Sequence, residues 1–543
     1  MKRSFEFDFR FSSWITALCV LSLTVAAFQA AGQSVVQSWE GIRGPQDGVP
    51  PDPHGAPGPE GVITTVNLRI SYYTKAGAVV WGPVALSGTF FSSNAGAGNS
   101  DPAIVFDHAS RRYFVIMQEN NNSRFWINVA VSRNADPKTA GFADWITYRI
   151  DATQNAASNS AGGINYGGDY PGLGVDAQAL YVTYNMYGFV PNGTLSGLGA
   201  DSNGSQLTIL NKSQLVNGAA VNVRELALVG QDLKPVTPFG GNSGNLVYLA
   251  QVWNQTNVRM TAVSNPLGAA TVANQFLIVN DLGPGPANFA PQQGAASTLD
   301  PISGRTLGNA SLIGTDLWFC ATRGPAAGPA VAAYYRLRLN GWPSSGNSVT
   351  VAEQGTVGGT SYWNFCPSIG LNQRGDAVMT WTRSSSTSFP TMMVASRIGS
   401  DSSFGTPIVI HASAGPNNDD DGSMQSHNRW GDYFSVWPDP NDGSLWAISE
   451  WSRAAAPADT GTWSTWLAQI AMPAQNYYVN LNGNPNNGDG SQFLPWTTVT
   501  RAHEFIISGT IRIYTGHYNE HITLNKAVTL LNYGGGPVTI GAP

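Results

Sequence analysis

Short runs of apolar residues, some continuous and some alternating with polar ones, recur along almost the whole chain and predict β-strands. They are rich in Val, Ile, Tyr, Phe and Trp, and Gly, Pro, Asn and Asp bound them, as strand and turn preferences require. Apolar residues at the i, i+3, i+4 and i+7 spacing of an amphipathic helix are almost absent. The pattern therefore predicts an all-β protein.

One unit recurs within this pattern. It is a small or acidic residue, often next to proline, then an apolar strand, a turn and a second strand rich in aromatic residues. Clear copies occupy residues 100–118, 168–185, 307–323, 364–383 and 429–451, and weaker ones occupy 51–67 and 235–253. The intervals are 49, 68, 68, 72, 57 and 66 residues when the copies are anchored on Asp52, Asp101, Asp169, Thr237, Asn309, Cys366 and Asp432.

A repeat of this kind favours a β-propeller, whose minimal blade takes about 40–45 residues, with loop insertions that lengthen each blade. Seven copies favour seven blades. Six blades are the alternative, in which the first copy completes the last blade as a closing strand. A two-sheet sandwich also accommodates many strands, but its strands would not return to one fixed motif.

The first 32 residues have the pattern of a signal peptide. Lys2, Arg3 and Arg10 give a basic start, residues 14–28 are mainly apolar, and residues 30–32 are small. A membrane anchor is the alternative, although the apolar run is shorter than the roughly 20 residues that a membrane span needs. We therefore expect a secreted, extracellular or cell-surface protein, with the periplasm as another location and no membrane span after cleavage.

Composition narrows the function. Charged residues make up 11% of the 543-residue chain, against roughly 25% in typical soluble domains, and the net charge is −6. Nucleic acid is excluded as a partner because no basic cluster is present. Motifs for nucleotide binding, serine hydrolysis and thiol redox chemistry are also absent. After cleavage, Cys320 and Cys366 remain, either as a disulfide or as two buried free thiols.

The segments GDYPGLGVDAQALYVTYN (168–185) and RWGDYFSVWPDPNDGSLWAISEW (429–451) resemble blades of secreted bacterial propellers of the sialidase-like, bacterial-neuraminidase-repeat group. The resemblance covers residues 33–472 and implies the propeller fold there rather than a particular reaction. The arginine motif of the F/Y-R-I-P type and the strict Asp-boxes of catalytic sialidases are absent.

Residues 473–543 have a different character. A Tyr-Val strand, an Asn/Gly-rich loop and a G-x-Y-x-E turn at Gly516, Tyr518 and Glu520 resemble the entry to a right-handed parallel β-helix of the pectate-lyase-like type. About two coils fit before Pro543, and a solenoid generally needs at least three. We therefore expect the start of an incomplete β-helix in a truncated sequence; a short appendage packed on the propeller is the alternative.

Acidic residues at the starts of the repeats are the main candidates for a site. Because the innermost strands of a propeller line its central channel, Asp52, Asp101, Asp169 and Asp432 would converge at one mouth. Converging carboxylates repel one another unless a cation or hydrogen-bond donors compensate, and calcium is the cation that prefers such oxygen ligands. Alternatively, each Asp caps only its own turn.

These considerations define the candidate residues. The ligand-binding candidates are Asp52, Asp101, Asp169, Arg429, Trp430, Asp432 and Tyr433. The candidate catalytic carboxyls are Asp101, Asp169, Asp432 and Glu450. Aromatic rings that either stack on sugars or belong to the core are Trp126, Trp363, Trp430 and Trp437.

The N-x-D-x-D-G run at residues 417–422 supplies the metal candidates Asp419 and Asp421. It matches the first half of an EF-hand loop, but the twelfth position holds Asn428 instead of the bidentate acid. A solvated loop is the other interpretation.

Three classes of function fit this sequence, the third being a cell-surface structural part whose propeller only spaces other domains. The first is an extracellular binding module for a glycan or a surface protein. The second is a glycoside hydrolase, or another polysaccharide-active enzyme, that uses carboxylates at the channel mouth. Loss of turnover with an intact fold after replacing the acids would distinguish the enzyme from the binding module.

Overall fold

The computed structural model describes residues 33–541 except 45–47, 92–98, 157, 159–161, 192, 194, 196–200, 240–244, 296, 399–400, 420–426, 455–462, 473–474, 484–489, 491, 493–494 and 507. The predicted signal peptide at residues 1–32 and the metal candidate Asp421 lie outside the described residues. The predicted domain boundary after residue 472 lies beside such a gap.

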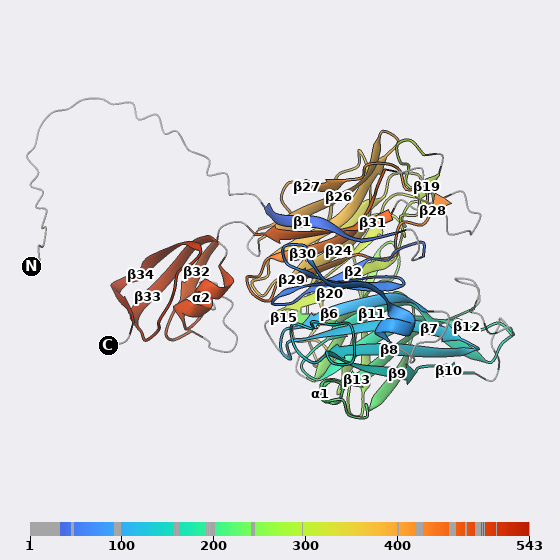
Figure 1. The fold of residues 1–543 in the computed structure, drawn as a ribbon, viewed down its shortest axis with the longest axis horizontal. Helices are drawn as coiled ribbons and strands as arrows, with labels where there is room; N and C mark the ends of the chain where they lie inside the picture. Colours follow the sequence, from blue (N-terminus) through green and yellow to red (C-terminus); the bar gives the residue numbers. More distant parts are fainter. Residues whose placement is uncertain are drawn as a thin grey trace, which may run out of the picture.

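The described chain is nearly all β-structure, as the sequence predicts, and forms a ring of antiparallel sheets (Figure 1). The innermost strands are β2 (His54–Pro57), β6 (Asn99–Asp107), β11 (Asn165–Val175), β15 (Lys234–Phe239), β20 (Thr306–Ile313), β24 (Trp363–Leu371) and β29 (Ser435–Pro438). Each lies beside the innermost strand of the next blade, and β29 contacts β2, which closes the ring.

Three further strands complete each blade. Blades 1 to 3 add β3 (Gly61–Val66), β4 (Arg69–Thr74), β5 (Val79–Ala85); β7 (Arg112–Asn121), β8 (Arg124–Ser132), β9 (Trp145–Asp151); and β12 (Ala179–Gly188), β13 (Ser202–Asn211), β14 (Val223–Leu228). Blades 4 to 6 add β16 (Leu246–Val252), β17 (Asn257–Ser264), β18 (Thr271–Ile278); β21 (Asp316–Arg323), β22 (Val331–Arg338), β23 (Thr350–Val357); and β25 (Ala377–Ser385), β26 (Ser388–Arg397), β27 (Ile408–Ala412).

Blade 7 decides the blade count. It contains β30 (Leu445–Ser452), β31 (Trp463–Ala471) and, as its outermost strand, β1 (Ser34–Arg43) from the start of the described chain. The closing strand is therefore β1, whereas the first repeat copy forms its own blade from β2 to β5. The propeller has seven blades within the described residues, and the six-bladed alternative is wrong because it assigned closure to that first copy.

Smaller elements connect or extend the blades. Strand β10 (Gln154–Asn155) extends blade 3, and β19 (Thr298–Leu299) pairs in parallel with β28 (His427–Asn428). Helix α1 (Lys212–Asn217) follows β13, where the Asn211 side chain accepts a hydrogen bond from Gln214 N and caps the helix. Among the described residues, no helix has the length and apolar character needed to cross a membrane.

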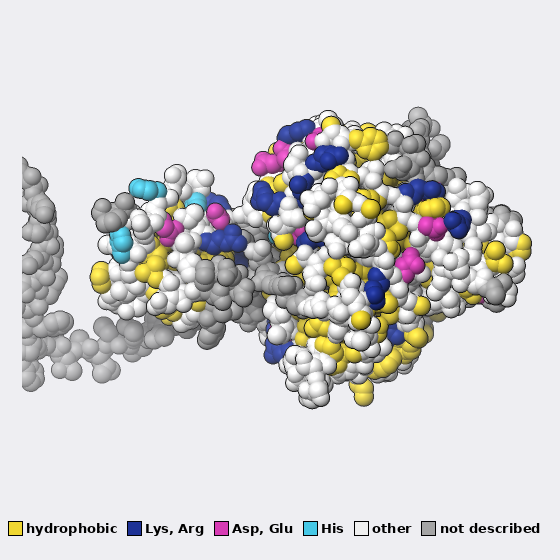
Figure 2. Space-filling view, turned by 90° about the horizontal axis from the view of Figure 1, so that it is seen from below, with side chains coloured by type: hydrophobic (Ala, Val, Ile, Leu, Met, Phe, Trp, Pro, Cys, Tyr) yellow, Lys and Arg dark blue, Asp and Glu magenta, His cyan; other side chains and the backbone are white. Residues whose placement is uncertain are grey.

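Position within a blade explains the hydrophobic pattern. All ten residues of β12 are buried because its sheet is covered on both faces, and its sequence is correspondingly almost continuously apolar or aromatic. The outer strands β14 and β18 alternate between exposed and less exposed residues. Figure 2 shows few charged side chains on the face it presents, consistent with the low charge content.

The residues after the propeller form a separate small unit. Strands β32 (Gln475–Val479), β33 (Ser508–Tyr518) and β34 (Ala527–Ile540) pair in parallel, and helix α2 (Val499–Phe505) packs beside them (Figure 1). The buried Tyr518 hydroxyl donates to the Val479 carbonyl at 3.2 Å. Glu520 caps α2 by accepting from Val499 N at 2.7 Å and Thr500 N at 2.8 Å. The parallel pairing of these strands agrees with the resemblance of the G-x-Y-x-E turn to the entry of a β-helix. The β-helix itself stays a prediction.

The two cysteines are buried and free, so the free-thiol alternative is correct and no disulfide joins them. Cys320 Sγ donates to the carbonyls of Leu307 and Pro367, each at 3.4 Å. Cys366 Sγ donates to Gly431 O at 3.4 Å. Both thiols therefore serve packing between inner strands.

The closing strand gives a test of the propeller. The half-buried Trp39 ring on β1 meets Trp446 edge-on at 5.0 Å between ring centres, so Trp39→Ala should lower the free energy of unfolding by about 2 kcal/mol. Val36 lies on the same strand and is 52% exposed, so Val36→Ala should change it by less than about 0.5 kcal/mol. Chemical denaturation of the three proteins measures both effects, and equal values for the two variants would contradict closure by β1.

Candidate functional site at the axis of the propeller

A left-handed residue before proline introduces the innermost strand of four blades. Asp52, Asp101, Tyr170 and Cys366 have φ of 48°, 54°, 60° and 48°, and a proline follows each of them. In blades 2, 3 and 6 the pairing register with the second strand shifts at this point. The acid-and-proline repeat in the sequence is therefore a β-bulge that re-aims side chains.

This geometry corrects one anchor of the repeat. Tyr170, rather than Asp169, occupies the left-handed position equivalent to Asp101. Asp169 pairs with Asn185 just before the bulge, as Ser100 pairs with Gln118. Asp169 therefore reaches the axis from a neighbouring position in the strand.

Charged side chains from several blades gather on the axis at the end of the ring where the innermost strands begin, here called the entry end. This axial cluster consists of Asp52, Asp101, Asp169, Asp232, Lys234, Arg305, Arg429 and Asp432. The sequence predicted the four acids at the repeat starts and Arg429, and the structure brings them together.

Three members of the axial cluster were missed. Asp232 is left-handed with φ of 60°, like Asp52 and Asp101, but Leu233 follows it instead of proline. Lys234 begins β15, and Arg305 directly precedes β20. Neither cation belongs to the acid-and-proline motif, so only their position at the start of an inner strand could have indicated them.

Asp52 is buried and tightly held. Its carboxylate accepts hydrogen bonds from Asp432 N at 2.6 Å and Asn67 Nδ2 at 2.7 Å. Burial, followed by the nearby charge of Asp432, raises the pKa of Asp52 to about 7, although Arg429 opposes the shift. This carboxyl therefore changes charge near neutral pH.

Asp101 and Asp169 form a carboxyl pair. Burial raises the pKa of Asp101 well above its usual value, and the Asp169 charge and a hydrogen bond between the two carboxyls raise it further. Gln118 Nε2 donates to Asp169 at 3.1 Å from the other side. The raised pKa of Asp101 favours its protonated form, which is the form that a general acid needs.

The cations lie against tyrosine rings. Lys234 Nζ donates to the Pro171 carbonyl at 2.6 Å and lies 4.0 Å from the centre of the Tyr170 ring, and burial lowers its pKa to about 8. The Arg305 guanidinium lies 4.8 Å from the same ring. Arg429 forms an ion pair with Asp432 at 2.5 Å. Hydrogen bonds, cations and a retained proton thus compensate the converging acids.

Three candidates lie behind the axial cluster. Trp430 is fully buried and donates from Nε1 to Thr382 Oγ1 at 2.9 Å, which places it in the core. Tyr433 is 3% exposed. Glu450 is fully buried without a hydrogen-bond partner among the described residues, and burial, Asp419 and Asp52 raise its pKa well above the usual range. All three side chains are buried, and their ligand-binding or catalytic roles stay predictions.

The other tryptophan candidates do not join the axial cluster. The Arg149 guanidinium lies 3.9 Å above the Trp126 ring on β8. Trp363 packs, half-buried, against the core. Trp437 is 3% exposed and meets Phe239 at the opposite end of the inner strands. Core packing is thus the role that the structure gives Trp430 and Trp437.

The metal candidate Asp419 has a structural role. Its Oδ2 accepts from Trp463 N at 2.7 Å, and its own N–H donates to Asn417 Oδ1 at 2.9 Å. Within the described part of the chain, no three Asp, Glu, His or Cys side chains are grouped as metal ligands. The described residues therefore give the calcium hypothesis no support.

Neither the scan against family models nor the search of curated proteins finds a match. Solved structures do match at low similarity. A protein of unknown function from Dyadobacter fermentans has 11% identity and a TM-score of 0.35, with 81% of this chain and 100% of that chain covered. Trypanosoma rangeli sialidase with the inhibitor DANA has 11% identity and a TM-score of 0.35, with 80% of this chain and 60% of that chain covered.

A third match is a neuraminidase-like protein of A/little yellow-shouldered bat/Guatemala, with 11% identity and a TM-score of 0.32. It covers 66% of this chain and 98% of that chain. Two of these three proteins are thus a sialidase and a neuraminidase-like protein. Similarity this low carries no information about the activity of this chain.

The raised pKa values predict how stability depends on pH. A carboxyl whose pKa is raised by folding binds its proton more tightly in the folded state. Its stabilising contribution is complete below the unfolded value of 3.8 and is lost as pH rises through the folded value, about 7 for Asp52. The melting temperature should therefore fall between pH 5 and pH 8 through Asp52 and Asp101.

Asp101→Asn tests this dependence, because Asn tolerates the left-handed backbone and imitates the protonated carboxyl. We expect the variant to lose about 2 °C less than the wild type between pH 5 and pH 8. Asp281→Asn, in an exposed loop, is the control and should follow the wild type. Parallel melting curves for Asp101→Asn and wild type would show that Asp101 does not hold a proton.

Proposed function

We propose that the protein is an extracellular binding protein that holds a glycan at the axial cluster. The proposal rests on strained backbone positions that direct side chains of several blades toward one point on the axis. Left-handed residues other than glycine cost roughly 1–2 kcal/mol each, and those at Tyr170 and Cys366 lack the short polar side chain that eases this conformation. Strain of this kind, repeated around one axis, is characteristic of functional sites.

The chemistry of the axial cluster favours a glycan. Asp169, Asp432 and Arg305 are partly exposed, so the site offers both hydrogen-bond acceptors and donors. Sugar hydroxyls both donate and accept hydrogen bonds. They therefore match this mixed surface better than a polymer whose charges all have the same sign. A surface protein that presents similar polar groups is the other partner that this proposal includes.

Secretion is part of the proposal. It rests on the basic, apolar and small-residue order of residues 1–32. The low charge content of the chain and the resemblance of residues 473–543 to polysaccharide-handling β-helices agree with an extracellular role. Fold analogy alone does not establish that role.

A glycoside hydrolase is the second candidate, and the Asp101–Asp169 pair favours it. Asp101 holds a proton that it could donate to a glycosidic oxygen, as the general acid of such enzymes does. Asp169 or Asp432 would then serve as the second carboxylate, acting as nucleophile or base. Hydrolysis and binding use the same axial cluster, so turnover distinguishes them.

A glycan array tests binding. Asp169→Asn and Arg305→Gln should each lower the signal for any glycan that binds by about tenfold, because each removes a charged hydrogen-bonding group. Asp281→Asn is the control for charge and should bind like the wild type. Since protons and cations already balance the acids, binding should be the same in calcium and in EDTA. Absence of any glycan signal would contradict glycan binding and leave a surface protein as the partner.

Turnover of a bound glycan tests the enzymatic alternative. Asp101→Asn should reduce the rate at least about 100-fold, the usual contribution of a general acid, while circular dichroism and the melting temperature at pH 5 remain those of the wild type. If the wild type binds a glycan without turnover, hydrolysis of that glycan is excluded and binding remains as the function.

A further inference from the structure

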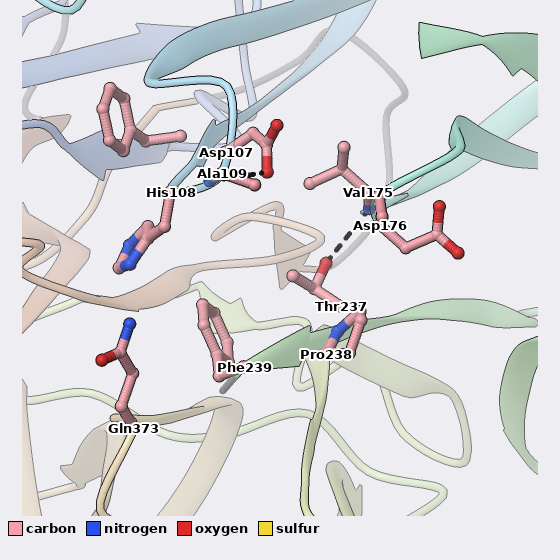
Figure 3. Close-up of a pocket in the computed structure, with 11 residues that line it drawn as sticks. Asp107, His108, Ala109, Val175, Asp176, Thr237, Pro238, Phe239 and Gln373 are labelled. Atoms are coloured by element: carbon pink, nitrogen blue, oxygen red, sulfur yellow. Dashed lines mark hydrogen bonds between the residues drawn. The ribbon is translucent and has the colours of Figure 1, made fainter. Parts of the chain in front are cut away.

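A second feature lies at the other end of the ring, here called the exit end, where the innermost strands finish. A cavity of about 330 Å³ is lined by residues at the ends of four inner strands (Figure 3). They are Phe106 to Ala109 at the end of β6, Val175 to Ala177 at the end of β11, Thr237 to Phe239 in β15, and Gln373 after β24. Blades 2, 3 and 4 thus meet blade 6 across the ring, which places the cavity on the axis. Its volume is at the lower end of the range for small-molecule sites, about 300–1,000 Å³.

The two acids in the lining are already occupied. Asp107 accepts from Ser110 N at 3.1 Å and forms a nearly buried ion pair with Lys212 at 2.8 Å. Asp176 accepts from two turn N–H groups, at 2.7 and 2.9 Å, and from the Tyr181 hydroxyl at 3.0 Å. These carboxylates stabilise turns and the Lys212 contact. No lysine or arginine is among the described residues that line the cavity, so the cavity offers no cation to an anionic ligand.

Three uncharged polar groups remain for a ligand. Burial lowers the pKa of His108 to about 4, and the ring hydrogen-bonds the Pro438 carbonyl. The neutral ring therefore keeps one nitrogen as an acceptor. Thr237 Oγ1 accepts from Val175 N at 3.3 Å, which leaves its hydroxyl hydrogen to donate. Gln373 adds an amide with both donors and an acceptor, and Figure 3 shows it directed toward His108.

The apolar part of the lining comes from aromatic rings. His108 meets Phe239 at 5.6 Å and Phe106 at 5.8 Å between ring centres. Val175 and Pro238 extend this surface. A flat apolar face packs well on such rings.

We propose that the exit-end cavity is a second ligand site, which takes a small uncharged compound with hydroxyl groups and one flat apolar face, of the size of a single neutral sugar ring. Hydroxyl groups match the His108 acceptor, the Thr237 donor and the Gln373 amide, and the carbon face of the ring packs on Phe239. This site does not depend on the axial cluster, since the two lie at opposite ends of the innermost strands.

Saturation-transfer NMR on the full-length protein tests the proposal with a matched pair of probes. Methyl β-D-glucopyranoside and methyl β-D-glucuronide differ only in the carboxylate of the second compound. We expect transfer to the ring C–H protons of the first and at least about tenfold less to the second. Gln373→Leu removes one hydrogen-bonding amide of similar size and should weaken binding of the first about tenfold.

Two variants separate the sites and guard against unfolding. Phe239→Ala removes the aromatic wall and should abolish transfer; Gln373→Leu, at a partly exposed position, supplies the test if Phe239→Ala unfolds. Asp169→Asn, in the axial cluster, should leave this binding unchanged. Absence of transfer to the glucoside would overturn the exit-end site. Binding that Asp169→Asn removes and Gln373→Leu does not would place the sugar at the entry end and also overturn it.

Discussion

The turn that leads each blade onto the axis is the constraint on which the rest of the structure depends. In four blades a left-handed residue followed by proline redirects the chain within the inner strand or just before it. Asp suits this position because its short polar side chain tolerates positive φ. The same requirement that builds the blade therefore also delivers carboxyl groups to the axis, at Asp52 and Asp101.

Concentrating acids on an axis creates an electrostatic cost that the protein offsets in three ways. Asp52 accepts two hydrogen bonds, Asp101 shares one with Asp169, and Lys234, Arg305 and Arg429 bring positive charge. The raised pKa of Asp101 is a consequence of this balance, and it is also what makes proton donation by that carboxyl chemically reasonable.

How much the sequence predicted depends on what each pattern encodes. Strand alternation and the spacing of the acid-and-proline motif determined the all-β class, the seven blades and the convergence of four acids, because both follow from local backbone geometry. The sequence pattern did not indicate Asp232, because Leu233 follows it where proline follows Asp52 and Asp101. Trp430 and Tyr433 were placed facing a ligand, yet both are buried. A repeat shows where an aromatic residue lies along a strand, but the bulge determines which way it points, and no sequence pattern reports that.

Buried side chains of the inner strands separate the axial cluster from the exit-end cavity. His54 lies on β2 between them, 5% exposed, with Ile104 N donating to its Nδ1 at 3.3 Å. Asn309 of β20 donates to Val436 O of β29 at 3.0 Å and hydrogen-bonds His54. Burial lowers the pKa of His54 to about 3, so this ring stays neutral and adds no charge between the ends. A ligand at the entry end would meet the charged groups of the axial cluster, whereas one at the exit end would meet the hydrogen-bonding groups of His108, Thr237 and Gln373.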